Sequence, residues 1–245
     1  MIFGTEILKY REAILKDLAD LVAVPSVRGA AREGMPFGPE PARALCLILD
    51  KAEKMGFAVR NVENYAGHAE FGSGDDLAAV AAHVDVVPAG EGWDTDPFTL
   101  TRKGNLYFGR GAADDKGAAV VALYCLKAIK DAGIRGNRRL RAIFGAGEET
   151  GMEDLDYYFG KEEMPSMGFT PDSDYGICNR EKGILRLDLL SGEKNESVVK
   201  EFQAGAVYNA VPDHAEAVLS CSAKTADALR KAARTAEGGF VFEPV

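Results

Sequence analysis

Apolar residues recur at helical spacing in three stretches of the chain: 7–22, 45–55 and 117–132. Such spacing predicts helices that turn one face to a core. The first stretch is followed by Pro25 and the other two by Gly56 and Gly133, which are residues typical of helix ends. We therefore predict three amphipathic helices in this part of the chain.

Three strands are predicted after the second and third helices: 57–65 alternates, and 77–84 and 140–144 are apolar runs. The run at 77–84 is continuous rather than alternating, as in a strand buried on both faces. Strands that alternate with helices predict an α/β fold with a largely parallel sheet and flanking helices. Between them, 31–41 predicts a loop, and 89–111 predicts a long loop and hairpin in which Trp93 packs.

The pattern changes after about residue 184, where strands with alternating polar faces replace the buried runs. Residues 184–190 and 216–222 predict such strands, and 225–236 predicts a helix with Thr225 as its N-cap. These elements indicate the start of a smaller α+β domain.

The last residues, 240–245, have the pattern of a strand that is just beginning. An element cut short at the end of a chain suggests that the sequence is a fragment. We therefore predict an α/β domain over residues 1–183 and the truncated beginning of a second domain over 184–245.

The composition indicates a globular protein without nucleic-acid or membrane partners. Of 245 residues, 47% are hydrophobic, which is enough for one large domain with a core. The net charge of −9 argues against non-specific binding to nucleic acids or anionic membranes, which requires clustered Lys and Arg. No apolar run approaches the ~20 residues of a membrane-spanning helix, and residues 1–20 lack the apolar core of a signal peptide.

The four cysteines are widely separated, at positions 46, 125, 178 and 221, and form no Cys-x-x-Cys pair. This pattern is not a disulfide framework and is typical of a reducing compartment. Cys46 and Cys125 lie inside helical patterns and are predicted to be small core residues. We predict a soluble, cytoplasmic protein, with a monomer favoured.

Acidic residues and a histidine follow the predicted strands, where open α/β sheets bind ligands. The first group is His83-Val84-Asp85, which closes the run 77–84. Residues i and i+2 of an extended segment point the same way. Asp85 could therefore accept a hydrogen bond from one imidazole nitrogen of His83 and leave the other for a metal. A solvated His–Asp pair is the alternative.

The second group is the pair Asp114-Asp115, which precedes the third predicted helix within the glycine-containing segment 109–117. Paired aspartates at a helix start can serve as caps that favour the helix dipole. The functional alternative is that one carboxylate bridges two metals.

The third group is Glu148-Glu149, in a glycine loop over 145–151 that superficially resembles a dinucleotide-binding loop. The two glutamates would stand where a pyrophosphate must bind, and their charges exclude that ligand. One could bind a cation while its neighbour acts as a general base on a bound water. An acidic helix N-terminus is the alternative.

Asp172 is the last acidic candidate, in a segment that leads into another short predicted strand, and an ordinary turn is its alternative. The other histidines are predicted at the surface, His68 in a solvated loop or hairpin and His214 in a turn. One histidine, several carboxylates and a spare glutamate suit zinc. Two metals ~3.5–4 Å apart would hold a hydrolytic water and a substrate carbonyl.

These residues lie in four motifs of one known family, at His83–Pro88, Gly109–Gly117, Gly147–Gly151 and Phe169–Tyr175. The order and spacing of these motifs resemble those of the PepV-type dipeptidases (Xaa-His or carnosinase-like) of the two-zinc aminoacylase and desuccinylase superfamily. The resemblance covers nearly the whole chain but only about the first half of a typical member. It implies the N-terminal part of a metallopeptidase catalytic domain, followed by the beginning of its lid domain.

The resemblance implies a site with two Zn²⁺ ions, for which Mn²⁺ or Co²⁺ could substitute. His83 and Asp172 would bind one zinc, Asp114 would bridge both, and Glu149 would bind the second. Manganese, cobalt and zinc all accept such imidazole and carboxylate ligands.

Further roles follow from the same resemblance. Asp85 would orient His83, and Glu148 would be the general base that activates the water between the metals. The peptide bond between Asp114 and Asp115 would be cis, as in the family. Asn209 would contact the carboxylate of the substrate.

The chain departs from the family in its histidines. In the family, the second zinc is also bound by a histidine near the C-terminus of a longer chain, and a histidine of the lid domain stabilises the oxyanion. Neither His68 nor His214 lies in the motifs that carry these histidines. Losing one oxyanion donor typically lowers the rate ~10²–10³-fold. If the 245 residues are the whole molecule, we expect weak activity or none.

The expected function is zinc-dependent hydrolysis of dipeptides with a free amino end. Desuccinylases and N-acyl amino acid deacylases share the motifs, but the contexts of 114–117 and 35–41 look most like the dipeptidases. A truncated fragment that binds metal without turnover is the second alternative. A nucleotide-binding domain is disfavoured by the glutamate pair.

Overall fold

The computed structural model of the chain describes residues 3–174, 176–180, 182, 183, 185, 187, 198–205, 214–235, 239 and 241. The chain divides into two compact units, Met1–Ile177 and Cys178–Val245. The division falls shortly before the predicted change at residue 184. Each unit is described by itself below.

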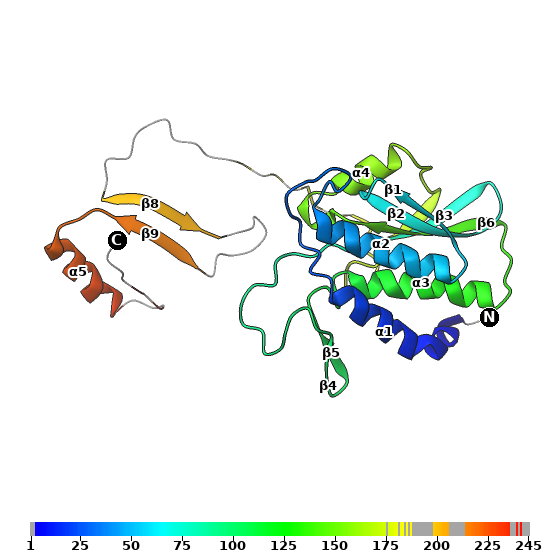
Figure 1. The fold of residues 1–245 in the computed structure, drawn as a ribbon, viewed down its shortest axis with the longest axis horizontal. Coiled ribbons are helices and arrows are strands. Elements are labelled where there is room, and N and C mark those ends of the chain that lie inside the picture. Colours follow the sequence, from blue (N-terminus) through cyan, green and yellow to red (C-terminus); the bar gives the residue numbers. More distant parts are fainter. Residues whose placement is uncertain are drawn as a thin grey trace. The chain divides into compact units, whose positions relative to one another are not determined.

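The first unit contains a five-stranded sheet in the order β1-β2-β6-β3-β7 (Figure 1). Its strands are β1 (Ala58–Val62), β2 (Ala66–Gly72), β3 (Asp76–His83), β6 (Arg138–Gly145) and β7 (Met167–Phe169). Strands β6, β3 and β7 run parallel, whereas β1 and β2 form an antiparallel edge. The α/β class with a parallel core of the sheet is confirmed, and the strand β2 was not predicted.

Helices cover both faces of this sheet. The chain begins with a 3₁₀ helix (Phe3–Tyr10) and α1 (Arg11–Val22); α2 (Pro39–Lys54) and α3 (Lys116–Asp131) lie side by side on one face, and α4 (Glu153–Phe159) lies on the other (Figure 1). Gly56 and Gly133 follow α2 and α3 with φ angles of +77° and +67°, so both helices end where glycine permits a left-handed turn.

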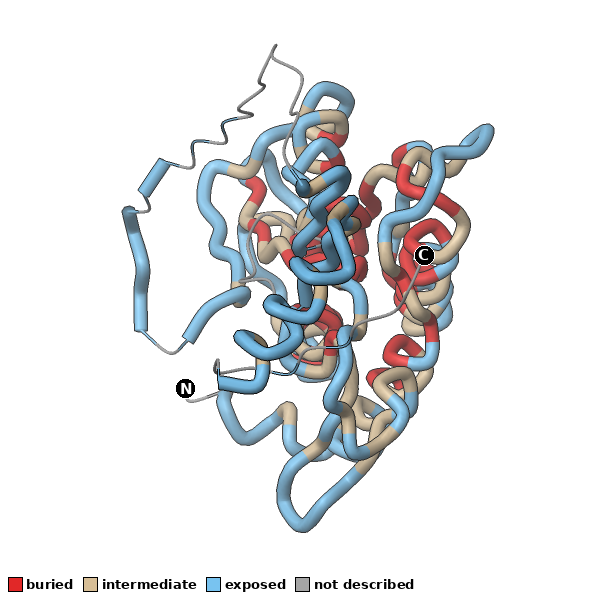
Figure 2. The backbone as a smooth tube through the Cα atoms, turned by 90° about the vertical axis from the view of Figure 1, so that its left-hand side faces the viewer, coloured by how far each residue is buried: buried red, intermediate tan, exposed pale blue. Residues whose placement is uncertain are grey.

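The core follows from the alternation of side chains along the strands. In β6, Ala142 and Phe144 pack with Leu45 of α2 and Leu123 of α3, whereas Ile143 between them packs with residues on the α4 face. Along the helices, buried residues recur about once per turn, and exposed residues lie between them (Figure 2). Two apolar layers therefore hold the sheet rigidly between helices.

A small hairpin of β4 (Thr101–Lys103) and β5 (Leu106–Phe108) follows a loop after β3. Trp93 in this loop donates a hydrogen bond from Nε1 to the carbonyl of Ala89 and stacks against the guanidinium of Arg110. The indole thus packs against the chain that flanks the hairpin.

The second unit contains the antiparallel pair β8 (Val199–Ala204) and β9 (Ala215–Leu219), followed by α5 (Ala223–Ala233). The predicted cap of this helix was wrong, because Ser222 is the N-cap and its Oγ accepts a hydrogen bond from the N–H of Thr225. The predicted strand over 184–190 lies largely outside the described residues, as do Asn209 and nearly all of 240–245. In the part that the structure describes, no helix has the length and apolarity to cross a membrane.

Two predictions about buried and exposed residues were wrong. Cys46 and Cys125 are exposed, because both lie outside the buried arc of their helix although their neighbours Leu45 and Tyr124 lie inside it. His68 is buried rather than solvated, since it lies on β2 between two paired strands. His214 is exposed, as predicted.

His68 belongs to a buried polar chain on the α4 face of the sheet. Tyr158 accepts a hydrogen bond from Nη1 of Arg141 at 3.0 Å, and its hydroxyl lies 2.7 Å from Nδ1 of His68. A phenolic hydroxyl can accept from Arg141 and donate its own proton to an unprotonated Nδ1, and this direction fits the burial of His68 and the nearby charge of Arg141, which disfavour a protonated ring. His68 is therefore held in the neutral form.

Folding stability is expected to depend on pH through His68. Burial, together with the charges of Arg141 and Arg60, lowers the pKa of His68 to about 3. Between pH ~6.5, the pKa of an unfolded histidine, and pH about 3 the unfolded chain therefore binds the extra proton. The free energy of unfolding should fall with decreasing pH in this window by up to ~1.4 kcal/mol per pH unit from this residue.

Urea unfolding of the wild type and of His68→Gln at several pH values between about 7 and about 5 measures this contribution. The glutamine variant cannot bind the proton, so its unfolding free energy should vary less steeply with pH. Equal slopes for the two proteins would contradict the prediction.

Candidate metal centre

The four motifs converge at one edge of the sheet, beyond the carboxyl ends of its parallel strands. His83 is the last residue of β3, Glu148 and Glu149 form a 3₁₀ turn just after β6, and Asp172 follows β7. Asp172 thus follows a strand, and the strand that was predicted to come after it would lie partly outside the described residues. Asp114 completes the group from the segment before α3. This edge is where open α/β sheets bind ligands.

His83 is held by one ring nitrogen and presents the other. Its Nδ1 lies 3.1 Å from the main-chain oxygen of Asp85 and 3.2 Å from Oδ1 of the same residue. Its Nε2 lies 3.1 Å from Asp114 Oδ1, 3.6 Å from Asp172 Oδ2 and 3.7 Å from Glu148 Oε2. Since Nδ1 faces two acceptors, it carries a proton, and Nε2 faces the acidic residues.

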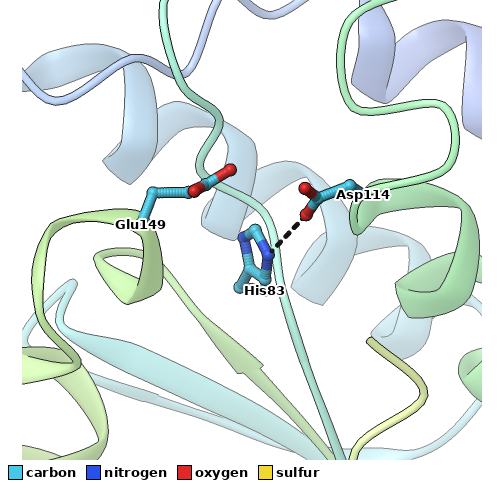
Figure 3. Close-up of side chains that lie close together, drawn as sticks. All are labelled: His83, Asp114 and Glu149. Carbon is cyan, nitrogen blue, oxygen red and sulfur yellow. Dashed lines mark hydrogen bonds and ion pairs between the residues drawn. The ribbon is translucent and has the colours of Figure 1, made fainter. Parts of the chain in front are cut away.

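Asp114 and Glu149 approach the imidazole of His83 from opposite sides (Figure 3). The side chain of Asp114 is 65% exposed, whereas that of His83 is 3% exposed. The acidic residues therefore surround the buried imidazole on a side that solvent and small molecules can reach.

Asp85 connects His83 to the glutamate loop. It is almost fully buried, and its two carboxylate oxygens accept hydrogen bonds from the N–H groups of Glu148 and Glu149, both at 3.2 Å. The Glu149 carboxylate in turn accepts a hydrogen bond from the backbone of Val87. One carboxylate thus fixes both the imidazole and the backbone of the two glutamates.

Asp115 was interpreted only as half of a capping pair, and the structure gives it another environment. It occupies the N-cap position of α3 without a capping hydrogen bond from its side chain. Its carboxylate is completely buried and accepts a hydrogen bond from the N–H of His83 at 3.2 Å through Oδ2. Its Oδ1 has no hydrogen-bond partner among the described residues. The peptide bond between Asp114 and Asp115 is cis, as the resemblance implied.

The residues fit a divalent cation. Two groups, His83 with Asp114 and Glu149, and His83 with Asp115 and Asp172, each bring their ligand atoms within 4.8 Å of one another. A histidine nitrogen with carboxylate oxygens is a donor set suited to zinc and similar cations. The buried, unpartnered oxygen of Asp115 is the kind of atom that a cation would satisfy.

The ionisation of the site reflects its burial and its crowded charges. Burial, with the charge of Asp172, raises the pKa of Asp115 and of Glu148 to about 7 in each case. Burial alone would lower the pKa of His83, but the carboxylates of Asp85, Glu148 and Asp172 outweigh it and raise the pKa to about 10. Burial also raises the pKa of Glu149. A cation that binds here must therefore displace protons near neutral pH.

Comparison with known proteins identifies the family. The model of Peptidase family M20/M25/M40 matches residues 79–243, which include all four motifs. The chain belongs to this peptidase family. The resemblance inferred from the motifs is thereby confirmed at the level of the family, whereas the role of each site residue stays a prediction.

Relatives of this M20 chain occur in bacteria. It is 40% identical over 226 residues to "Putative dipeptidase YtjP" of Bacillus subtilis (strain 168), covering 89% of this chain and 49% of the relative. It is 37% identical over 233 residues to "Putative dipeptidase SAB1611c" of Staphylococcus aureus (strain bovine RF122 / ET3-1), covering 92% and 50%. The chain thus spans about half the length of the curated relatives it matches.

Solved structures show the same fold. Human carnosine dipeptidase 1 has a TM-score of 0.59 and 22% identity, covering 70% of this chain and 41% of its own. An M20 family metallo-carboxypeptidase from Sulfolobus solfataricus has a TM-score of 0.55 and 20% identity, covering 64% and 37%. At this identity, the likeness concerns the fold of the M20 chain rather than its substrate.

Proposed function

We propose that this chain forms the metal-binding part of a zinc-dependent exopeptidase that hydrolyses dipeptides. The observation that carries the proposal is the meeting of His83, Asp114 and Glu149, with Asp172 and Glu148 also close to the same imidazole nitrogen. Membership of the M20 family and the names of the curated relatives support a peptide substrate.

Four side chains would hold the metals. We assign His83 and Asp172 to one zinc, Glu149 to the other, and Asp114 to a bridging position between them. When bound, the zinc pair would polarise the scissile carbonyl and lower the pKa of the attacking water. Asp85 keeps Nε2 of His83 directed at the centre through its hydrogen bond to Nδ1.

Glu148 is assigned the proton transfers. Its carboxylate lies at the centre, 3.7 Å from His83 Nε2, yet the metal assignment does not use it. Burial and the charge of Asp172 raise its pKa to about 7 in the metal-free chain, and bound cations would lower it. A carboxylate within reach of the attacking water is a suitable general base. Glu148 takes the proton of the attacking water and passes it to the leaving amine, and the peptide bond breaks.

Two other activities fit the same residues. An N-acyl amino acid deacylase or desuccinylase would use the same metals and the same base on a different acyl group. Metal binding without turnover is the other alternative, in which the same residues hold the metals but no substrate is cleaved. A panel of dipeptides and N-acyl amino acids, offered to the zinc-loaded chain, distinguishes the three possibilities. Asn209 remains a proposed contact for the carboxylate of the substrate.

Bound zinc per chain is the first measurement. We expect the purified 245-residue protein to bind zinc at a two-metal site, and Glu149→Ala and Asp172→Ala each to bind less. Asp174→Ala is the matched control, because Asp174 is exposed two residues from Asp172 and belongs to neither group of candidate ligands. Its zinc content should equal that of the wild type.

The variants also separate the two halves of the centre. If the wild type binds a single zinc, and only Asp172→Ala loses it, the second position does not assemble in this chain. A wild-type chain that binds no zinc would contradict the proposed function, while the family assignment would stand on the sequence.

A further inference from the structure

Three consecutive backbone N–H groups, those of Gly147, Glu148 and Glu149, are held by two buried carboxylates. Asp85 accepts hydrogen bonds from the two glutamates, and Asp154 accepts one from Gly147 through Oδ2 at 2.9 Å. Asp85 belongs to the motifs of the metal centre, whereas Asp154 lies in α4, outside all of them. Asp154 therefore reaches the glutamates only through the backbone.

Asp154 is completely buried, and both of its oxygens are used by backbone donors. Oδ2 accepts from Gly147, and Oδ1 accepts from the N–H of Leu155 at 2.8 Å. Among the described residues no Lys, Arg or His forms an ion pair with it, and burial raises its pKa to about 6. A buried carboxyl group without a cation is unfavourable unless hydrogen bonds compensate it, so these two bonds fix its position.

The loop that Asp154 holds has little room to move. A Cβ atom added to Gly145 would lie 2.3 Å from Oδ2 of Asp154. On the other side, a Cβ atom added to Gly147 would lie 2.7 Å from the ring of Phe37, which is itself almost fully buried. The glycines thus allow Asp154 and Phe37 to approach the backbone just before the two glutamates.

The helix that carries Asp154 is anchored to the sheet by a different side chain. Tyr158, one turn further along α4, is completely buried and bonds to His68 of β2 and Arg141 of β6. Tyr158 fixes the helix and has no hydrogen bond to the loop. Tyr158 therefore anchors α4 and Asp154 contacts the loop, so that a variant of each residue tests one role without the other.

We propose that Asp154 is a positioning residue of the metal centre, which holds Gly147 so that Glu148 and Glu149 face His83. Its effect on the metals rests on the proposed function, whereas its hold on the loop rests on the hydrogen bond and the close approach at Gly145. Among the described residues Asp154 has no hydrogen bond or ion pair with a candidate ligand side chain, so it acts through the backbone.

The test compares Asp154→Asn with Tyr158→Phe. A carboxamide offers one acceptor oxygen, so either Gly147 or Leu155 loses its partner in Asp154→Asn. We expect Asp154→Asn to weaken Zn²⁺ binding ~10–100-fold in titration calorimetry and to speed amide hydrogen exchange at 147–149. Tyr158→Phe should lower the melting temperature and leave both the Zn²⁺ affinity and the exchange at 147–149 unchanged.

Wild-type Zn²⁺ affinity in Asp154→Asn, or equal losses in both variants, would overturn the proposal and make Asp154 a structural residue only. If the wild-type chain binds no Zn²⁺, the proposed function fails and hydrogen exchange alone decides. Faster exchange at 147–149 confined to Asp154→Asn then supports the positioning role, and unchanged exchange overturns it. If Asp154→Asn does not fold, Gly145→Ala displaces Asp154 from the end of β6, because the added Cβ would lie 2.3 Å from Oδ2 of Asp154 but at an ordinary 3.7 Å from Cβ of His83. It should then weaken Zn²⁺ binding and speed exchange at 147–149, and wild-type values of both would overturn the proposal.

Discussion

Replacing Asp85 by alanine is expected to weaken Zn²⁺ binding by ~100-fold. The carboxylate of Asp85 is 1% exposed and contacts Nδ1 of His83 and the N–H groups of Glu148 and Glu149 at the same time. Without it the imidazole can turn away from the centre, and the backbone that carries both glutamates loses its acceptors. Titration calorimetry with Zn²⁺ at fixed pH and salt measures the loss.

Asp85→Asn is the matched control, because it removes the same charge and keeps one acceptor oxygen. Its Zn²⁺ affinity should lie between those of the wild type and Asp85→Ala. Equal affinities for the two variants would attribute the effect to charge alone. Wild-type affinity in Asp85→Ala would show that the three contacts do not organise the centre.

The position of the centre could be predicted because it depends on local patterns. The apolar run 77–84 matches β3 (Asp76–His83) to within one residue, and a buried parallel strand needs such a run. Once the strand ends are known, the rule that ligands bind beyond the carboxyl ends of parallel strands brings His83 and Glu148 together. The particular ligand roles came from the family resemblance and remain predictions.

The strand β2 could not be predicted from its own residues. Its sequence, Ala66–Gly72, contains two glycines, a histidine and a glutamate and lacks a run of large apolar side chains. It forms a strand because β1 and β6 pair with it on both sides. The burial of His68 likewise depends on Tyr158, 90 residues away in the sequence. Pairing between distant segments overrides the weak local preference for a strand.

The two buried aspartates, Asp115 and Asp154, escaped the sequence interpretation for the same reason. Each stands at the start of a helix, where an aspartate ordinarily caps the helix or favours its dipole. In the fold, Asp115 accepts from the N–H of His83, 32 residues away, and Asp154 accepts from Gly147 in the preceding loop. The adjacency of Asp115 to Asp114 was the available signal for the first, and none marked the second.

Gly117→Ala is expected to destabilise the fold by ~3 kcal/mol and to weaken Zn²⁺ binding as well. Gly117 is the second residue of α3, and a Cβ atom there would lie 2.2 Å from the carbonyl oxygen of Ala112. That oxygen belongs to the backbone, so a rotamer change cannot relieve the clash. The segment between Ala112 and α3 must move, and it carries Asp114 and Asp115. Denaturant unfolding and Zn²⁺ titration measure the two effects.

Gly136→Ala is the control for a glycine substitution in the same unit. A Cβ atom at Gly136 would lie 3.8 Å from its nearest neighbour, the N–H nitrogen of Arg138, which is an ordinary contact. Its stability should change by less than ~0.5 kcal/mol, with wild-type Zn²⁺ affinity. If Gly117→Ala lost stability but kept its Zn²⁺ affinity, the aspartates would not depend on the close approach of α3 to Ala112. Loss of both stability and Zn²⁺ affinity would show that Gly117 is needed to place the carboxylates of Asp114 and Asp115.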